Sequence, residues 1–225
     1  MPPKKEGARR PLSPEAFQER AAVSRETLDR FHLYAALLTK WNRAINLVSA
    51  ASMADLWRRH FLDSAQLRCF LPAAQAGDGL IILDVGTGAG FPGLVLALLG
   101  CGEVHLVEAD RRKAEFLREA VRVTGANAQV HAARIEALTA FPVDVVTCRA
   151  FAPLPQILDL TERFLLASNR GIQPVGLFLK GRRADEELTA AAKKWRLRLE
   201  RFASETDPEA SILRLRLQSL GDEAT

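Results

Sequence analysis

The stretch 84–93, DVGTGAGFPG, constrains the fold of this 225-residue chain more than any other. It follows the apolar run Leu80 to Leu83 and precedes the apolar run Leu94 to Leu99, the pattern of a strand, a glycine turn and a helix start. Glycines at 86, 88 and 90 allow positive φ angles and let a ligand approach the backbone without meeting a Cβ. Open α/β sheets bind nucleotide-like ligands at such a turn, where a parallel strand ends.

The identity of that ligand depends on Asp84. Gly88, Gly90 and Gly93 also fit the literal G-x-G-x-x-G pattern of dinucleotide-binding proteins. A carboxylate would repel the negatively charged pyrophosphate of a dinucleotide, whereas it would attract the positively charged ammonium and sulfonium groups of S-adenosylmethionine. We therefore favour S-adenosylmethionine as the cofactor, with S-adenosylhomocysteine as the product. A dinucleotide and a purely structural βα turn remain alternatives.

The distribution of apolar residues predicts three segments: a disordered basic tail at 1–12, an N-terminal helical cap at 13–75 and an S-adenosylmethionine-binding domain at 76–225. The fold class is α/β, with a doubly wound, Rossmann-like sheet that ends in an antiparallel pair. Strands are expected at 80–85, 103–108, 128–132, 143–148, 175–180, 197–202 and 211–217, and helices at 25–41, 55–67, 110–125, 153–166 and 184–195.

Composition permits a polyanionic partner without requiring one, since the net charge is +4 and the basic residues concentrate at 4–10 and 182–201. The three cysteines, Cys69, Cys101 and Cys148, lack the spacing of metal ligands, so we expect free, buried thiols in a reducing compartment. No apolar stretch is long enough to span a membrane and no signal sequence is recognisable. A monomeric cytoplasmic enzyme without a metal or a membrane partner is the expectation.

Helix 55–67 brings several polar side chains to one face. Arg59 and Asp63 are four residues apart, and His60, Asp63 and Ser64 are separated by three and four. A catalytic triad is excluded, because no strained turn presents Ser64 and neighbouring helical residues cannot adopt triad geometry. Either Arg59 and Asp63 form a surface ion pair, or the patch faces the cofactor cleft.

Three strand ends add candidate site residues. Glu108 lies 22 residues after Gly86, the separation at which α/β nucleotide sites place a carboxylate on ribose hydroxyls. Arg149 ends the fourth strand, where it would face the cleft beside Asp84. Lys180 ends the fifth strand and would supply a positive charge near a phosphate or base.

Taken together, several short motifs resemble those of the ribosomal small-subunit RNA methyltransferase G family, also called glucose-inhibited division protein B. The resemblance covers roughly residues 31–182 in order and at the family's spacing. The matching segments are Trp41-Asn42, Asn46-Leu47, His60 to Ser64, Asp84 to Gly93, Lys113 to Leu117, Arg134 to Glu136, Arg149 to Ala152 and Lys180-Gly181.

The resemblance implies a class I methyltransferase that methylates N7 of one guanine in the decoding region of 16S rRNA, within the small subunit or an assembly intermediate. It implies that Gly86 and Phe91 contact the cofactor, that Ile135 and Glu136 flank its adenine, and that Arg149 lines the pocket. The expected cofactor-binding residues are then Asp84, Gly86, Gly88, Phe91, Glu108, Ile135, Glu136 and Arg149. Two positions depart from the family: Glu108 replaces the usual aspartate, and Glu209-Ala210-Ser211 replaces a frequent Arg-His.

A guanine N7 target is consistent with strand ends that carry no dedicated base, because N7 has an in-plane lone pair and does not have to be deprotonated. Alignment of the reactants alone can contribute roughly 7–11 kcal/mol. The fourth strand lacks the Asn/Asp-Pro-Pro-aromatic signature used on exocyclic amines. Arg149, Lys180, His60 and Asn46 are the candidates for holding the base or an adjacent phosphate. The alternatives are another RNA site, a small-molecule or protein acceptor, an NAD-dependent oxidoreductase and a non-catalytic RNA-binding module.

Overall fold

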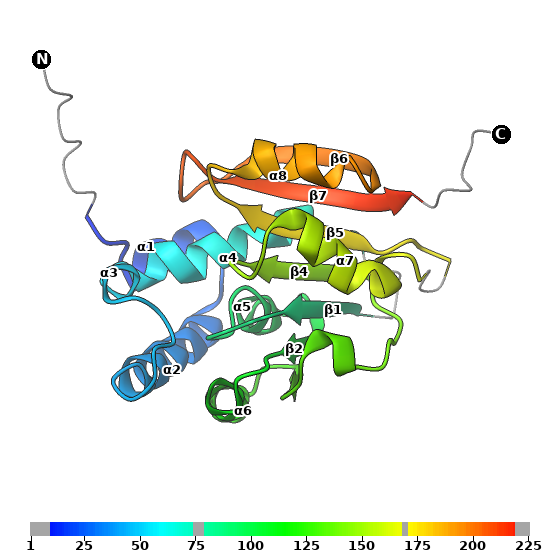
Figure 1. Ribbon diagram of the computed structural model, residues 1–225. Helices are drawn as coiled ribbons and strands as arrows, with labels where there is room; N and C mark the ends of the chain where they lie inside the picture. The colour runs from blue at the N-terminus through cyan, green and yellow to red at the C-terminus, as the bar shows by residue number, and fades with distance from the viewer. Residues whose placement is uncertain (1–9, 74–78, 168–170, 219–225) are drawn as a thin grey trace, which may run out of the picture.

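A seven-stranded sheet with the order β3-β2-β1-β4-β5-β7-β6 forms the centre of the computed structural model, which describes residues 10–73, 79–167 and 171–218 (Figure 1). Strands β1 to β5 are parallel, β7 is antiparallel to β5, and β6 is antiparallel to β7. The strands are β1 (Leu80–Val85), β2 (Gly102–Val107), β3 (Ala128–His131), β4 (Val145–Arg149), β5 (Val175–Lys180), β6 (Arg196–Ala203) and β7 (Ser211–Gln218). The predicted doubly wound sheet with its terminal antiparallel pair is confirmed.

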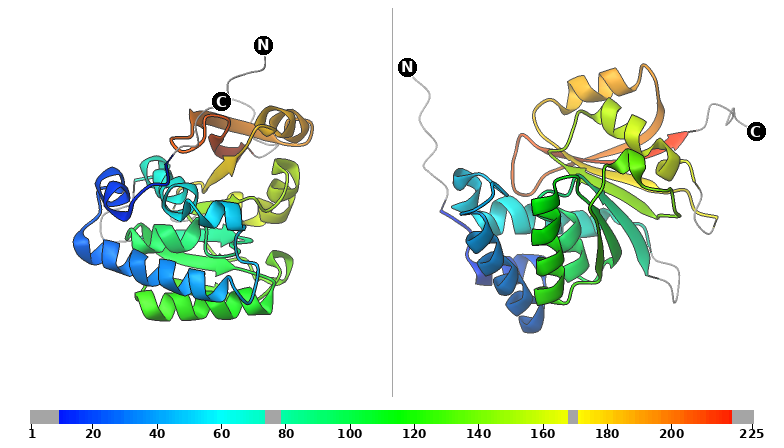
Figure 2. Two further views of the ribbon diagram at one scale, coloured as in Figure 1. Left: turned by 90° about the vertical axis from the view of Figure 1, so that its left-hand side faces the viewer. Right: turned by 60° about the horizontal axis from the view of Figure 1, so that its bottom comes forward.

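Helices cover both faces of this sheet (Figure 2). On one face lie α5 (Gly93–Leu98) and α6 (Arg111–Thr124), and on the other α7 (Leu154–Leu165) and α8 (Ala184–Ala191). A short 3-10 helix, η3 (Ile135–Ala137), follows β3. Asp110 caps α6 by accepting from the backbone N–H groups of Arg112 and Lys113, and Gly125 ends it at a φ of 59°. The local capping signals therefore set the bounds of the helix beside the glycine turn.

The N-terminal helices form a further layer on α5 and α6 (Figure 2). They are α1 (Pro14–Ala21), α2 (Arg25–Trp41), α3 (Ala50–Met53), the π-helix η1 (Trp57–Leu62), α4 (Asp63–Ala65) and the 3-10 helix η2 (Gln66–Phe70). The side chains of Ser13 and Ser24 cap α1 and α2 by accepting from the backbone N–H groups of Ala16 and Thr27. This cap shares one hydrophobic core with the face of the sheet that α5 and α6 cover.

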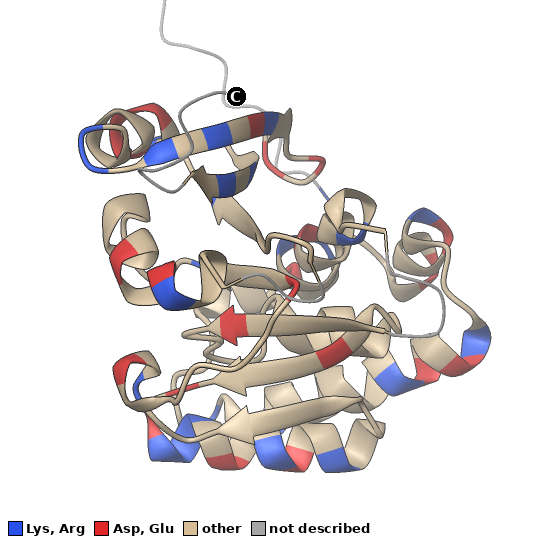
Figure 3. Ribbon diagram, turned by 90° about the vertical axis from the view of Figure 1, so that its right-hand side faces the viewer, with Lys and Arg blue, Asp and Glu red and all other residues tan. Residues whose placement is uncertain are grey.

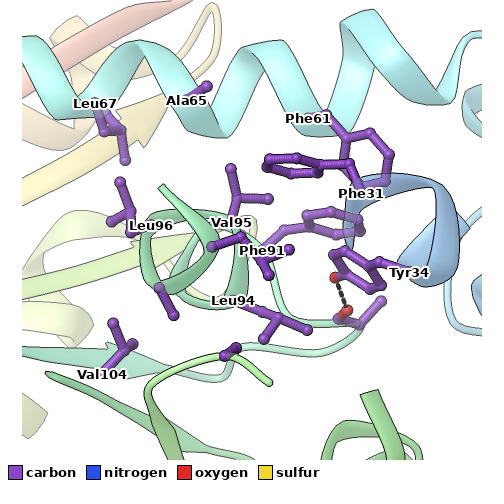
Figure 4. Packing of buried hydrophobic residues seen from close by; sticks show 14 of the residues in the cluster. Phe31, Tyr34, Phe61, Ala65, Leu67, Phe91, Leu94, Val95, Leu96 and Val104 are labelled. Carbon is purple, nitrogen blue, oxygen red and sulfur yellow. Dashed lines mark hydrogen bonds between the residues drawn. The ribbon is translucent and has the colours of Figure 1, made fainter. Parts of the chain in front are cut away.

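Aromatic side chains join the cap to the glycine turn. Phe31, Tyr34 and Phe61 are fully buried and pack around Phe91, which belongs to the turn (Figure 4). The Tyr34 hydroxyl donates a hydrogen bond to the carbonyl oxygen of Ala89. Because each such ring contributes about 1.5–3 kcal/mol on burial, the cap holds the turn in a fixed position.

Several expectations need correction. Helix 55–67 is not one α-helix, because the π-helix η1, the short α4 and the 3-10 helix η2 follow one another there, and helix 184–195 ends at Ala191. Residues 10–12 are not a free tail: the Arg58 side chain donates to the Arg10 carbonyl, and the Leu12 N–H donates to the Asp55 carboxylate. The remainder of the predicted tail, 1–9, and the predicted boundary at 75/76 lie outside the described residues.

Among the described residues, no helix is long and apolar enough to cross a membrane, and no group of three His, Cys, Asp or Glu side chains could hold a metal ion. The cysteines are free thiols, but only Cys148 is buried, whereas Cys101 is half-buried and Cys69 is exposed. Burial raises the pKa of the Cys148 thiol well above its usual range. It is a core residue rather than a nucleophile.

Candidate active site

A cavity of about 640 Å³ opens at the carboxyl ends of β1, β2 and β4, between the sheet and the cap. This is the topological switch point of the sheet, where open α/β folds bind ligands. Its volume lies within the range of small-molecule and cofactor sites. Eight predicted site residues line it: Gly86, Gly88, Phe91, Glu108, Ile135, Glu136, Arg149 and His60.

The glycine turn forms the floor of this first cavity. Gly86, Gly88 and Gly90 have φ angles of 64°, 60° and 98°, a region that L side chains rarely adopt. A Cβ at Gly86 would lie 2.1 Å from the ring of Phe151, whereas a Cβ at Gly88 would meet nothing closer than 4.0 Å. The turn therefore needs glycine at 86 for both conformation and space.

Asp84 supports the turn from below and does not line the cavity. The residue is fully buried, and its Oδ2 accepts hydrogen bonds from the Thr87 hydroxyl and from the Gly93 N–H at 2.8 Å. Burial, opposed by those two hydrogen bonds, raises the pKa of Asp84 to about 7. The placement differs from the predicted direct attraction for the cofactor, because the carboxylate is turned toward the backbone of the loop.

Glu108 reaches the cavity from the end of β2. One carboxylate oxygen accepts from the Gly88 N–H at 2.9 Å and the other from the Asp110 N–H at 2.8 Å. These bonds fix the carboxylate at the mouth of the turn and leave further lone pairs for hydroxyl donors. Ile135 and Glu136, from η3, line the same cavity.

A second cavity of about 670 Å³ adjoins the first. The two share a wall, residues 149–153, which follows β4 and turns at Ala150 with a φ of 51°. The ring of Phe151, 39% exposed, lines both cavities. Arg59, Asp63, Lys180 and the β6–β7 hairpin tip at Asp207 complete the second cavity. Residues 149–153 are therefore the boundary between the two cavities.

Arg149 organises the junction of the cavities. Its guanidinium donates to the Asp63 carboxylate at 3.1 Å and to the Arg59 carbonyl at 2.8 Å, and it contacts the His60 Nδ1. It also lies 4.8 Å from the ring centroid of Phe91. Of the two alternatives for this face of helix 55–67, the surface ion pair of Arg59 with Asp63 is wrong, because the structure pairs Asp63 with Arg149.

His60 is held neutral. Burial, together with the charges of Arg149 and Arg59, lowers its pKa to about 3. Its Nδ1 accepts from Arg149, so the proton of the neutral ring is on Nε2. That Nε2 is buried without a partner among the described residues, and the ring stacks on Phe91 at 4.6 Å. The histidine thus offers a hydrogen-bond donor and no proton acceptor at the first cavity.

Lys180 and Asn46 differ from the roles predicted for them. The Lys180 ammonium is buried, donates to the Ala152 carbonyl at 2.7 Å and pairs with Glu187 at 2.9 Å. It lines the second cavity and anchors the shared wall. Asn46 is exposed and lines neither of these cavities; the neighbouring Asn42 instead holds the loop, accepting from the Leu47 and Val48 N–H groups.

Two further residues support the second cavity, and sequence reasoning missed both. The Thr206 hydroxyl donates to the Asp63 carboxylate, and Gln66 bonds the Glu205 N–H at 2.8 Å. Each contact joins the cap to the β6–β7 hairpin across about 140 residues of sequence, and no local pattern in the chain indicates such a pair.

Solved structures of low sequence identity share the fold. A mutant of MtNAS in complex with S-adenosylmethionine matches 92% of this chain and 85% of its own with a TM-score of 0.54 at 14% identity. An rRNA methylase from Streptococcus thermophilus matches 70% of this chain and 95% of its own with a TM-score of 0.50 at 12% identity. The sheet order and the cavity at the switch point therefore define a Rossmann-like, class I methyltransferase fold.

Sequence comparison assigns the family. The family model for rRNA small subunit methyltransferase G, GidB, matches residues 27–207. The ribosomal RNA small subunit methyltransferase G of Rhodospirillum rubrum is 54% identical over 91% of this chain and 97% of its own length. That of Paramagnetospirillum magneticum is 47% identical over 93% and 98%. The chain belongs to the GidB family of small-subunit rRNA methyltransferases, as its motifs predict.

Proposed function

We propose that this chain transfers a methyl group from S-adenosylmethionine to N7 of a guanine in the decoding region of 16S rRNA. One observation carries the proposal: a cavity with the glycine turn as its floor and a second cavity of similar volume share the wall formed by residues 149–153. A cofactor in the first and a flipped-out base in the second would be separated by that wall alone. Membership of a methyltransferase family argues against the oxidoreductase alternative.

The residues of the first cavity fit S-adenosylmethionine. The Glu108 carboxylate is fixed where ribose hydroxyls can donate to it, Ile135 offers an apolar surface for an adenine, and the buried Nε2–H of His60 can donate to a carboxylate. When bound, S-adenosylmethionine supplies an electrophilic methyl group carried by a sulfonium ion.

The residues of the second cavity fit a nucleotide. Arg59 is exposed at its edge, and none of the described residues forms an ion pair with its guanidinium. The exposed ring of Phe151 offers a stacking surface, which is a common way to hold an unstacked base. Arg149 stands between the two cavities and orients both His60 and Asp63.

Transfer to a ring nitrogen fits the electrostatics of the site. Guanine N7 carries a lone pair and no proton, so the protein needs to bind and align it rather than deprotonate it. The side chains at the junction are accordingly occupied: His60 Nδ1 accepts from Arg149, and Asp63 is paired with the same guanidinium. Alignment by Arg149 and Phe151 is then the main contribution of the chain.

The substrate is small-subunit rRNA, within the subunit or an assembly intermediate, and the enzyme acts as a cytoplasmic monomer. The test compares cells with and without the gene by mapping N7-methylguanine in 16S rRNA. We expect one guanine of the decoding region to lose its N7 methyl group in the deletion strain and to regain it when the gene is restored. An unchanged modification pattern would refute the proposal, and a lost mark elsewhere would assign another RNA site.

A further inference from the structure

The β6–β7 hairpin has one apolar and one strongly basic face. Residues directly opposite each other in an antiparallel pair share a face. On one side Leu213, Leu215 and Leu217 are buried in the core beside α7. The other side carries four arginines, two from each strand: Arg196, Arg198, Arg214 and Arg216. Figure 3 shows these bands of positive charge along both strands at the edge of the sheet.

This arginine face is not neutralised by the described part of the chain. Of the four, only Arg214 pairs with a carboxylate of the described residues, that of Glu200, so four positive charges meet one negative charge. Arg198 and Arg216 stand directly opposite each other in the register, an arrangement of like charges that destabilises a sheet by roughly 0.2–1 kcal/mol. Folding alone gives no reason for such a pair, whereas an anionic partner does.

A buried, unpartnered donor lies at the centre of the arginine face. The Nε of Arg214 is inaccessible to solvent and makes no hydrogen bond with the described residues. It borders a polar cavity of about 60 Å³ lined by Arg198, Glu200 and Arg216. Because this Nε is not accessible to a ligand, the phosphate contacts fall to Arg198, which is exposed, and to Arg216, which is half-buried.

The arginine face begins a short distance from the second cavity. Ser211, where β7 begins, pairs in register with Lys180 at the edge of that cavity. At about 3.4 Å per residue, Arg214 and Arg216 lie roughly 10 and 17 Å further along the strand. Their side chains are on the face opposite to that of Ser211, beyond the contact between Phe70 of the cap and Phe202. An RNA that places a base in the second cavity can therefore reach the arginine face with phosphates several nucleotides away.

We propose that the arginine face binds the phosphate backbone of small-subunit rRNA beside the target guanine; this inference rests on the proposed rRNA substrate. The contacts carry no base readout, since phosphates are the same at every nucleotide. They would set the affinity of the enzyme for rRNA and its dependence on salt. An acidic protein is the other class of partner that a basic face can attract, and it is an outcome of the test.

The test is the double variant Arg198→Gln/Arg216→Gln, compared with Arg118→Gln/Arg122→Gln on α6. The control removes the same charge from exposed arginines that already pair with glutamates. Binding of full-length small-subunit rRNA is measured at several salt concentrations by filter retention. For the test variant we expect about tenfold weaker binding, a salt slope smaller by about 1 for each lost phosphate contact, and a raised KM for rRNA. The kcat and the affinity for S-adenosylhomocysteine should match the wild type.

Equal affinity and an equal salt slope for both double variants would overturn the inference. An acidic protein would then be the partner that the arginine face indicates. The single variant Arg216→Gln, which relieves the like-charge pair, guards against misfolding and should show half of the change in slope. Methylation at a site other than N7 would overturn the proposed function instead, and it would leave the binding comparison intact.

Discussion

The two cavities are built in different ways. The first takes most of its lining from the sheet, namely residues 84–93, the residues that follow β2 and β3 and a wall from β4, and the cap adds Leu47, Val48 and His60. The second depends on contacts between segments far apart in sequence: Arg149 with Asp63, and Asp63 with Thr206 on the hairpin. The first cavity is thus formed mainly by the sheet, whereas the second exists only when cap, wall and hairpin are together. Substitutions should therefore affect the two cavities to different extents.

The largest effect is expected at Arg149, which belongs to both cavities. Replacement by alanine leaves Asp63 unpaired while 84% of its side chain is shielded from solvent, and it releases His60. Because a small misplacement of reacting groups costs about 100-fold in rate, we expect kcat for rRNA methylation to fall by at least that factor. Loss of one partner of a buried ion pair should also lower the free energy of unfolding by about 3–5 kcal/mol.

The measurement for Arg149→Ala is single-turnover methylation of rRNA, with urea unfolding in parallel. Arg183→Ala is the control, since Arg183 is exposed and pairs only with Glu186. An Arg149→Ala enzyme that keeps wild-type kcat would show that the two cavities do not depend on a common residue.

The second prediction tests the glycine turn of the first cavity. Gly86→Ala places a Cβ 2.1 Å from Phe151 and forces a positive φ, whereas Gly88→Ala changes only the conformational preference. We expect Gly86→Ala to weaken binding of S-adenosylhomocysteine more than tenfold, and Gly88→Ala to cost about 1 kcal/mol of stability. Calorimetry measures the binding.

A double variant identifies the cause of the Gly86→Ala defect. If the clash with the Phe151 ring is responsible, Gly86→Ala/Phe151→Ala should bind the product better than Gly86→Ala does. No recovery would assign the defect to backbone strain. Gly88→Ala should keep rRNA binding within about twofold of wild type, because the turn does not line the second cavity, whereas loss of the Phe151 ring should weaken it, because Phe151 lines both cavities.

These contrasts explain what the sequence can predict. Strand β1 and the glycine turn are encoded by neighbouring residues, so their bounds and positive φ angles follow from the local pattern. Asp63 is different. Its spacing from Arg59 is compatible with an i,i+4 ion pair, yet the guanidinium of Arg149 on β4, 86 residues away, pairs with it instead. Asn46, which is exposed, and Lys180, which donates to the Ala152 carbonyl, differ from their predicted roles for the same reason. The burial and the partners of a side chain are set by tertiary contacts.

The third prediction uses pH to separate His60 from Asp84. A histidine with a folded pKa of about 3 binds fewer protons than the unfolded chain between pH 3 and 6.5, so stability from His60 is lost as pH falls through that window. Asp84, with a pKa of about 7, has the opposite sign: its stability is lost as pH rises from about 4 to 7. The two dependences partly cancel in the wild type.

The His60→Gln substitution removes the pH dependence that comes from His60, while it keeps an acceptor for Arg149 and a donor at the cavity. We therefore expect the difference in unfolding free energy between wild type and variant to shrink as pH falls from 6.5 to 4, by at most about 1.4 kcal/mol per pH unit. Urea titrations at pH 4, 5, 6 and 7 measure it. A difference that is constant with pH would contradict a buried neutral histidine.

The smallest effect is expected at the hairpin. Thr206→Val is nearly isosteric and removes one hydroxyl donor to Asp63, leaving the bond to Arg149 in place. A hydrogen bond to a charged group contributes about 1.5–3 kcal/mol, and Gln66 still donates to the same carboxylate at 3.0 Å, so the loss should be near the lower end. The Asp63 carboxylate would tilt, and Arg149 with it.

For Thr206→Val we expect a severalfold increase in KM for rRNA and an unchanged affinity for S-adenosylhomocysteine. Thr189→Val is the matched control, because the Thr189 hydroxyl bonds only a carbonyl within α8. A parallel loss of cofactor affinity would mean that the hairpin supports both cavities, and the separation of the cofactor and acceptor sides would fail. A change confined to KM for rRNA would instead extend the acceptor site from the wall to the hairpin, because Thr206 both lines the second cavity and holds Asp63.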